Sequence, residues 1–166
     1  NNIEDTAEIL TKMREQIIKS LDQKGLQGEN KDGMDMALCK YDPKKGTVQY
    51  SGAYNPLIHI SKNQINQLKG DSQPVGLHTG KKLSFTNKEI QVAKGDMLYI
   101  YSDGFPDQFG GEKGKKYLSG KFKKFLLSIS DKPIDEQNTL IKAEFTNWIG
   151  DHEQIDDVCV MGVRIT

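Results

Sequence analysis

Apolar side chains near the start of the chain recur at intervals of three and four residues. The positions of this stripe are Ile9, Leu10, Met13, Ile17, Ile18 and Leu21. Such spacing places side chains on one face of an α-helix, and Asp5 or Thr6 can cap the first turn. We therefore expect a helix that runs to about Lys24, followed by a polar connection that contains Gly25 and Gly28.

Beyond this helix the chain divides into short strand-like runs separated by turn residues. The runs cover residues 34–41, 47–51, 57–61, 64–68, 83–92, 97–102 and 158–165. Residues 42–46 (Asp-Pro-Lys-Lys-Gly) have the composition of a turn, and Lys62-Asn63 separates the next pair of runs, so we expect two hairpins. The 97–102 run is apolar on both faces, which predicts a strand in the centre of a sheet.

Two further helices are predicted between the last two strands. The first has an apolar side formed by Phe122, Phe125, Leu126 and Ile129. Pro133 fits the first turn of the second, where a missing backbone N–H does no harm, and Gly150 ends it. Strands that are grouped in hairpins, with helices following and not alternating with them, predict an α+β fold with an antiparallel sheet.

Size and charge favour an ordinary soluble domain. The 166 residues suit a single domain spanning residues 1–166, and 23 basic residues balance 23 acidic ones. No global field therefore favours nucleic acid or a membrane surface. Membrane-span and signal-peptide patterns are absent, so we expect a cytoplasmic location, with Cys39 and Cys159 as buried thiols of a reducing compartment.

Three pairs of acidic residues stand at the boundaries of predicted strands. They are Asp32 with Asp35, Asp103 with Asp107, and Asp156 with Asp157. A divalent cation makes crowded carboxylates tolerable, and oxygen ligands without nearby histidine or cysteine select Mg²⁺ or Mn²⁺ over Zn²⁺. Asp103 and Asp156 are the candidate catalytic metal ligands, because each adjoins an apolar strand.

Each of these features also has an ordinary structural explanation. Asp103-Gly104 has the composition of a strand-ending turn, and Asp156-Asp157 that of a solvated strand start. Residues 110–116 (Gly-Gly-Glu-Lys-Gly-Lys-Lys) can attract a phosphoprotein or form a solvated loop, and they lack the order of a nucleotide-binding loop. The histidines, which have no ligand spacing, are His59, His78 and His152.

The sequence around the acids resembles a known family. Residues 94–104 (Lys-Gly-Asp-Met-Leu-Tyr-Ile-Tyr-Ser-Asp-Gly) and 156–160 (Asp-Asp-Val-Cys-Val) resemble the SpoIIE-like branch of the metal-dependent protein phosphatases, the protein phosphatase 2C-like superfamily. Further matches in the family's order are 32–38 (Asp-Gly-Met-Asp-Met-Ala-Leu), 50–57 (Tyr-Ser-Gly-Ala-Tyr-Asn-Pro-Leu) and 74–76 (Pro-Val-Gly). Each motif is weak alone, whereas the ordered set is specific and covers essentially the whole chain.

This resemblance implies both a fold and a chemistry. The implied fold is α+β, an antiparallel β-sandwich flanked by helices, with a centre of two Mn²⁺ or Mg²⁺ ions whose activated water attacks phosphoserine or phosphothreonine in a protein. Asp103 and Asp156 match the family's metal-binding aspartates, and Asp157 takes the adjacent position, usually Asn or Asp. Cys159 stands where threonine is common, which changes a neighbour of the site and not a ligand.

The resemblance also implies partners and exposes one departure. Family members act in bacterial signalling on phosphoproteins, often anti-sigma-factor antagonists, and carry an upstream sensor. Their earlier acidic motif (Asp-Gly or Gly-His-Gly) has no counterpart between Asn1 and Thr166. We therefore expect a C-terminal portion of the domain, truncated before its first strands and half of the metal centre, with negligible activity alone and bare strand edges that favour a homodimer. The alternative is a non-catalytic, partner-binding regulatory module with the same fold.

Overall fold

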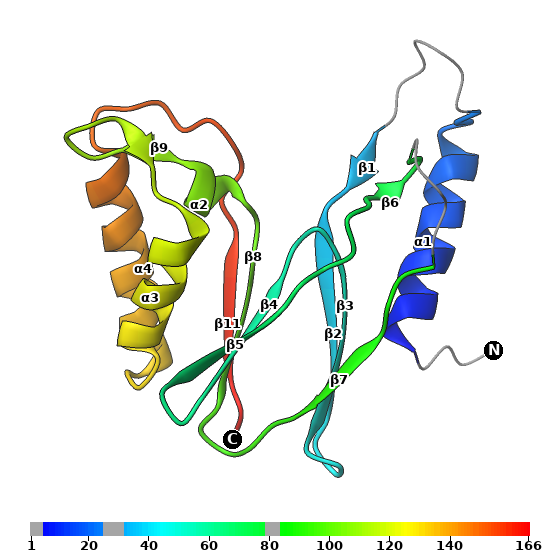
Figure 1. Ribbon diagram of the computed structural model, residues 1–166, viewed down its shortest axis with the longest axis horizontal. Helices are drawn as coiled ribbons and strands as arrows, with labels where there is room; N and C mark the ends of the chain where they lie inside the picture. The colour runs from blue at the N-terminus through cyan, green and yellow to red at the C-terminus, as the bar shows by residue number, and fades with distance from the viewer. Residues whose placement is uncertain (1–4, 25–31, 79–83) are drawn as a thin grey trace. The chain divides into compact units, whose positions relative to one another are not determined.

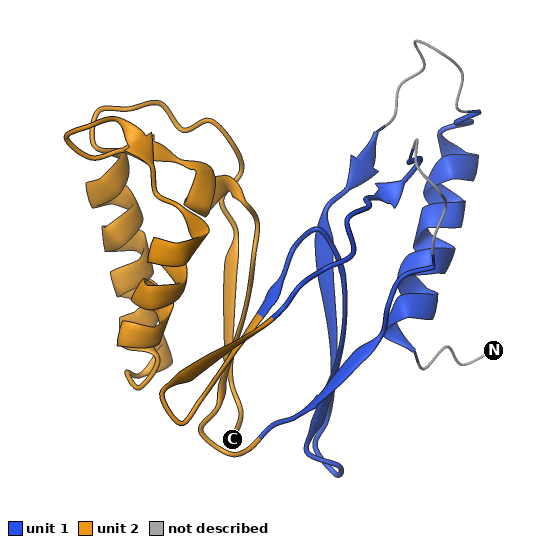
Figure 2. Ribbon diagram, in the orientation of Figure 1, with its two compact units in different colours: residues 1–57, 68–92 blue, residues 58–67, 93–166 orange. Residues whose placement is uncertain are grey.

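The structure is a computed structural model that describes residues 5–24, 32–78 and 84–166. The chain forms two compact units, unit 1 with residues 1–57 and 68–92, and unit 2 with residues 58–67 and 93–166 (Figure 2). Each unit has its own apolar core. That residues 1–166 form a single domain stays a prediction. Residues 25–31 of the predicted connection, which extends from Gln23 to Lys31, and the first residue of the 83–92 run lie outside the described residues.

In its described residues, unit 1 combines one helix with two small antiparallel sheets (Figure 1). Helix α1 spans Thr6–Ser20, and Asp5 caps it by accepting hydrogen bonds from the backbone N–H groups of Ala7 and Glu8. The larger sheet has the order β2-β3-β7, with bounds Met36–Asp42, Thr47–Ala53 and Lys88–Gln91. The smaller sheet pairs β1 (Gly33–Met34) with β6 (Val75–Gly76).

The apolar stripe of α1 is what holds unit 1 together. Leu10 is fully buried in a cluster that also contains Ala7, Ala53, Val75 and Phe85. The helix ends at Ser20, earlier than the predicted Lys24. Asp22 explains the early end, because its φ of 49° lies in the left-handed region, where an α-helix cannot continue.

Unit 2 is built on a four-stranded sheet in the order β11-β8-β4-β5. The bounds are Leu57–Ser61 for β4, Gln64–Leu68 for β5, Met97–Tyr101 for β8 and Val160–Arg164 for β11. Strand β8 has a neighbour on each side, so the predicted central position is confirmed. Strand β11 lies at the sheet edge and pairs antiparallel with β8.

Three helices and a short hairpin complete unit 2. The helices are α2 (Gly104–Asp107), α3 (Ser119–Ile129) and α4 (Ile134–Ile149), and the hairpin joins β9 (Phe109–Gly110) to β10 (Lys115–Lys116). Figure 1 shows α3 and α4 side by side next to the sheet. The apolar core of unit 2 includes the rings of Phe105, Tyr117 and Phe122. The ring centroids of Phe105 and Phe122 lie 4.4 Å apart. Because Phe105 belongs to α2, this aromatic core holds α2 against the end of strand β8.

Most of the predicted elements are confirmed. Both hairpins form, and Asp42 stabilises the first turn by accepting hydrogen bonds from the N–H groups of Lys44 and Lys45. The 83–92 run is strand only over Lys88–Gln91. Pro133 is the N-cap residue of α4 and lies directly before its first turn, not within it. No helix in the described part of the chain is long and apolar enough to cross a membrane.

The cysteines differ from expectation. Cys39 is half-buried on β2, and burial raises the pKa of its thiol to about 11. Cys159 is exposed, so the prediction of two buried thiols is wrong for this residue. It precedes the edge strand β11, and an edge position leaves a side chain without a covering neighbour on one side.

Candidate functional site

The two acidic segments singled out in the sequence meet at one end of the unit 2 sheet. Tyr101 lies opposite Val160 in the antiparallel pair of β8 and β11, so residues after β8 lie beside residues before β11. The Ser102 N–H continues this pairing by donating to the Cys159 carbonyl oxygen, 3.0 Å away. We call residues 102–104 and 156–159 the acidic junction.

The side chain of Ser102 ties the two segments of the acidic junction together. Its hydroxyl donates to the carbonyl oxygen of Asp157, 2.8 Å away, and accepts from the N–H of Cys159, 2.9 Å away. One side chain thus satisfies two backbone groups of the opposite segment, which otherwise have no strand partner. The segment that carries Asp156 and Asp157 is therefore held in register with the strand that leads to Asp103.

Gly104 allows this close approach. A Cβ atom at this position would lie 2.4 Å from the carbonyl oxygen of Asp157, which is less than any real van der Waals contact. Asp103 precedes α2, and its carbonyl oxygen accepts from the N–H of Asp107, while its side chain makes no cap hydrogen bond. The Asp103 carboxylate is left exposed at the end of a buried strand.

All three predicted site residues stand at this one end of the sheet. Asp103, Asp156 and Asp157 are exposed. One carboxylate oxygen of Asp156 accepts the N–H of Asp157 at 2.7 Å, and the Asp156 carbonyl oxygen accepts from the Gln154 amide. Asp156 is thus turned toward its own backbone, whereas the side chain of Asp103 has no such bond.

Gln108 is a positioning residue that the sequence analysis missed. It is fully buried, and its amide nitrogen donates to the carbonyl oxygen of Glu153 at 2.8 Å. Its amide oxygen accepts the N–H of Ile155 at 3.4 Å. Gln108 therefore anchors the loop that leads to Asp156. A polar residue following Asp107 gave no signal of this role, because the contact spans 45 residues of sequence.

The remaining acidic candidates are Asp107 of α2 and, in unit 1, Asp32 and Asp35. Asp107 pairs with Lys116, whose ammonium lies 2.9 Å from its carboxylate, and Asp32 and Asp35 flank β1 in unit 1. Within residues 5–24, 32–78 and 84–166, no three His, Cys, Asp or Glu side chains form a group that could hold a metal ion.

A buried hydrogen-bonded pair in unit 2 joins His59 of β4 to Asp96, with 2.8 Å between Nε2 and Oδ2. Burial alone would raise the pKa of the Asp96 carboxyl. Hydrogen bonds from the Ala93 N–H, Ser61 and His59 outweigh burial and hold that pKa below its ordinary value. This pair links strand β4 to the turn before β8, so its role is structural.

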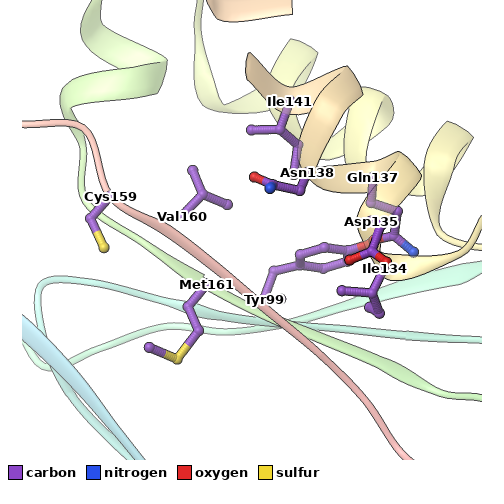
Figure 3. Close-up of a pocket in the computed structure, with 10 residues that line it drawn as sticks. Tyr99, Ile134, Asp135, Gln137, Asn138, Ile141, Cys159, Val160 and Met161 are labelled. Carbon is purple, nitrogen blue, oxygen red and sulfur yellow. The ribbon is translucent and has the colours of Figure 1, made fainter. Parts of the chain in front are cut away.

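A hollow of about 350 Å³ lies between the start of α4 and the edge strand β11. Figure 3 shows Tyr99, Val160 and Ile141 at its apolar side, with Asp135 and Asn138 on the helix. The Tyr99 hydroxyl is already bonded to Gln137 at 2.7 Å. The hollow contains none of the three predicted site residues.

Comparison with known proteins decides the family. The family model of Stage II sporulation protein E (SpoIIE) matches residues 3–166. The chain belongs to the SpoIIE family. No curated protein matches the chain.

Solved structures extend this SpoIIE-family assignment to the fold. The SiaA-PP2C domain of Pseudomonas aeruginosa is similar with a TM-score of 0.86 and 27% identity, over 98% of this chain and 61% of that chain. The phosphatase domain of SpoIIE from Bacillus subtilis gives a TM-score of 0.57 and 16% identity, over 99% of this chain and 75% of that one. PppA, a key regulatory component of T6SS in Pseudomonas aeruginosa, gives a TM-score of 0.65 and 16% identity, over 93% of this chain and 67% of that one.

This SpoIIE-family chain therefore has the protein phosphatase 2C-like fold, a mixed α+β fold with antiparallel sheets and helices. Both the predicted fold class and the resemblance are confirmed. The chain spans 61% of the SiaA domain chain.

The acidic junction offers oxygen atoms of the kind that a hard divalent cation binds. Phosphatases of this fold generally use Mn²⁺ or Mg²⁺, and both ions prefer carboxylate and carbonyl oxygens. Asp103, Asp156 and Asp157 offer only such oxygens, and the Asp103 carboxylate is exposed without a cap bond. The residues therefore fit the chemistry of the metal, although the described part of the chain contains no group of three ligands.

Proposed function

We propose that this chain is a module of a metal-dependent phosphatase that removes phosphate from phosphoserine or phosphothreonine in protein partners. Its SpoIIE-family membership and its protein phosphatase 2C-like fold support this function. The observation that carries the proposal is the double hydrogen bond of Ser102, which joins the Asp103 end of β8 to the segment of Asp156 and Asp157.

Asp103 and Asp156 are the proposed ligands of Mn²⁺ or Mg²⁺, with Asp157 beside them. A bound divalent cation supplies positive charge that lowers the pKa of water and stabilises phosphoryl oxygens. The role of the chain is to position its carboxylates. Ser102 holds the two segments in register, Gly104 allows their close approach, and Gln108 anchors the loop before Asp156. A Bacillus subtilis SpoIIE phosphatase structure described as Mn presoaked, similar at a TM-score of 0.61, supports the choice of metal.

The proposed setting is bacterial signalling in the cytoplasm. Solved relatives include a chain that combines RsbU and RsbW domains and a SpoIIE phosphatase domain with a fragment of its regulatory domain. By analogy, the partners are a phosphoprotein of the anti-sigma-factor antagonist type and a sensor in the same protein. A further proposed partner is a second copy of the chain, paired through the exposed edge of β11.

Mn²⁺-dependent dephosphorylation by the full-length protein tests the proposal. We expect Asp103→Asn and Asp156→Asn to lower kcat by at least about 100-fold on both a phosphoprotein and p-nitrophenyl phosphate, because each removes a charge that holds the metal. Asp151→Asn is the matched control, since Asp151 is an exposed acid of the same loop outside the acidic junction. Full activity of Asp103→Asn would refute the assignment.

One observation favours a second candidate, a partner-binding regulatory module without catalysis. The Asp156 carboxylate is turned to its own backbone, and no group of three metal ligands occurs in the described residues. For residues 1–166 alone we propose weak metal affinity and negligible activity. Calorimetry with Mn²⁺ separates the candidates: the phosphatase binds Mn²⁺ in the full-length protein and loses binding in Asp103→Asn, whereas the regulatory module binds none.

A further inference from the structure

A basic hairpin projects from unit 2 directly after α2. It consists of residues 109–116, in which Lys115 lies opposite Gly110 and Lys116 opposite Phe109. We call these residues the basic hairpin. The proposed function assigns no role to it, although its lysines and glycines stood out in the sequence.

The basic hairpin is packed in place by Trp148 of α4. A Cβ atom at Gly110 would lie 1.9 Å from the Trp148 carbonyl oxygen, and one at Gly111 would lie 2.9 Å from the indole ring. The Gly111 N–H donates to the same carbonyl oxygen at 2.8 Å, and the indole N–H donates to Gln108. The backbone of the hairpin is therefore fixed against a helix, which distinguishes it from a solvated loop that happens to contain lysines.

The side chains of the basic hairpin form a small cationic surface. Residues 112–116 contain three lysines and one glutamate, all exposed. Lys116 pairs with Asp107, whereas Lys113 and Lys115 have no acidic partner within the described part of the chain. Phe109, which is 41% exposed, adds an apolar contact surface at the base. Because the whole chain carries no net charge, this surface is a local feature.

This surface adjoins the acidic junction. Lys116 contacts Asp107 of α2, the helix that Asp103 precedes, and Gln108 bonds to Glu153 and Ile155 in the loop that leads to Asp156. Figure 1 shows the hairpin, α2 and the loop between α4 and β11 at the same end of unit 2. An anionic partner that approaches the exposed carboxylates of the junction is repelled by them, and neighbouring unpaired lysines offset that repulsion.

We propose that the basic hairpin docks an acidic segment of a protein partner, held by Lys113 and Lys115 with Phe109 as an apolar contact. A polypeptide fits better than nucleic acid, because the patch offers only two unpaired lysines and lies beside three exposed carboxylates that repel a continuous polyanion. That this partner is the phosphoprotein substrate rests on the proposed function, whereas docking itself does not.

Binding of an unphosphorylated acidic peptide tests docking without catalysis. The probe is a fluorescein-labelled nonapeptide in which four Glu or Asp residues alternate with Ser and Gly around a central Leu, and its uncharged counterpart carries Gln or Asn at the acidic positions. We expect the full-length protein to bind the acidic probe in low salt. Lys113→Glu/Lys115→Glu should weaken the affinity for this probe about tenfold or more, since two attractive charges become repulsive.

Matched variants exclude a general charge effect. Lys124→Glu/Lys142→Glu makes the same change in net charge at exposed positions of α3 and α4 and should bind the probe normally. Lys113→Arg/Lys115→Arg keeps both charges and should retain binding. An equal loss in the Lys124/Lys142 variant, no binding of the acidic probe, or equally tight binding of an oligouridylate of the same charge overturns the proposal.

Turnover in the same variants separates the two hypotheses. With a phosphoprotein, Lys113→Glu/Lys115→Glu should raise KM about tenfold with little change in kcat, and with p-nitrophenyl phosphate it should change neither. If the full-length protein binds the acidic probe through these lysines but shows no turnover, docking stands and the phosphatase assignment fails. Turnover with an unchanged KM contradicts docking of the phosphoprotein substrate at these lysines and leaves the phosphatase assignment intact.

Discussion

The hydroxyl of Ser102 donates a hydrogen bond to the backbone carbonyl oxygen of Asp157, 2.8 Å away and 55 residues distant in sequence. The Ser102 hydroxyl oxygen also accepts a hydrogen bond from the backbone N–H of Cys159, 2.9 Å away. These two bonds join the chain leaving β8 to the chain entering β11. The proposed metal ligands are therefore positioned by a neutral side chain that binds no metal itself.

Ser102→Ala is expected to loosen the acidic junction. Loss of both bonds should lower the free energy of unfolding by about 1–2 kcal/mol and weaken Mn²⁺ binding by the full-length protein. Urea unfolding and calorimetry measure the two effects. Ser128→Ala is the control, because Ser128 bonds only to Phe125 within its own helix. Unchanged Mn²⁺ affinity in Ser102→Ala would contradict the positioning role.

Gly104→Ala should disrupt the same junction by steric overlap. The added Cβ meets the Asp157 carbonyl oxygen at 2.4 Å, so the backbone must move, and we expect a loss of about 1–3 kcal/mol of stability. Gly120→Ala provides the contrast, since nothing lies within 4 Å of its added Cβ and Gly120 belongs to α3. We expect Gly120→Ala to be neutral or to stabilise by up to about 1 kcal/mol. Thermal unfolding of both variants checks this difference, and equal midpoints would argue against it.

The His59–Asp96 pair should give unit 2 an acid-sensitive stability. Because hydrogen bonds from the Ala93 N–H, Ser61 and His59 outweigh burial and hold the folded-state pKa of Asp96 below its ordinary 3.8, the ionised Asp96 carboxyl stabilises the fold fully above that pH. This contribution is lost as the pH falls through the lower, folded-state pKa. Asp96→Asn should reduce stability by about 1.5–3 kcal/mol at pH 7.

Urea unfolding from pH 7 down to pH 2 measures the Asp96 contribution. The stability difference between the natural protein and Asp96→Asn should stay constant down to about pH 4 and shrink below it. Asp131→Asn, which alters an exposed acid of unit 2, is the matched control for the loss of one carboxyl group. A difference that grows as the pH falls would have the wrong sign for this explanation.

The edge of β11 should mediate self-association. Met161 and Val163 are 55% and 48% exposed, and an antiparallel pair of two β11 strands centred on Gly162 would place Met161 opposite Val163 of the second copy. Sedimentation of residues 1–166 should show a concentration-dependent dimer, and Met161→Glu should weaken it. Met34→Glu introduces the same charge at a 45% exposed position of β1 and should leave dimerisation unchanged. A monomer at all concentrations would exclude this pairing.

Local pattern determined much of this protein in advance. The stripe of α1, the turn at Asp42, strands β4 and β5 and the central apolar strand β8 all follow from side chains close in sequence, because periodicity and turn chemistry act over a few residues. The ordered motifs also indicated the SpoIIE family, and Asp103, Asp156 and Asp157 were identified as candidates without coordinates.

Only the tertiary structure decided how these candidates are held. Ser102 reaches Asp157 across 55 residues, Gln108 reaches Glu153 across 45, and Gly110 fits against Trp148 of α4. No local pattern encodes such contacts, because they arise from strand register and helix packing after the chain has folded back on itself. The exposure of Cys159 was mispredicted for the same reason, since apolar neighbours in sequence do not reveal that a strand will stand at the edge of its sheet.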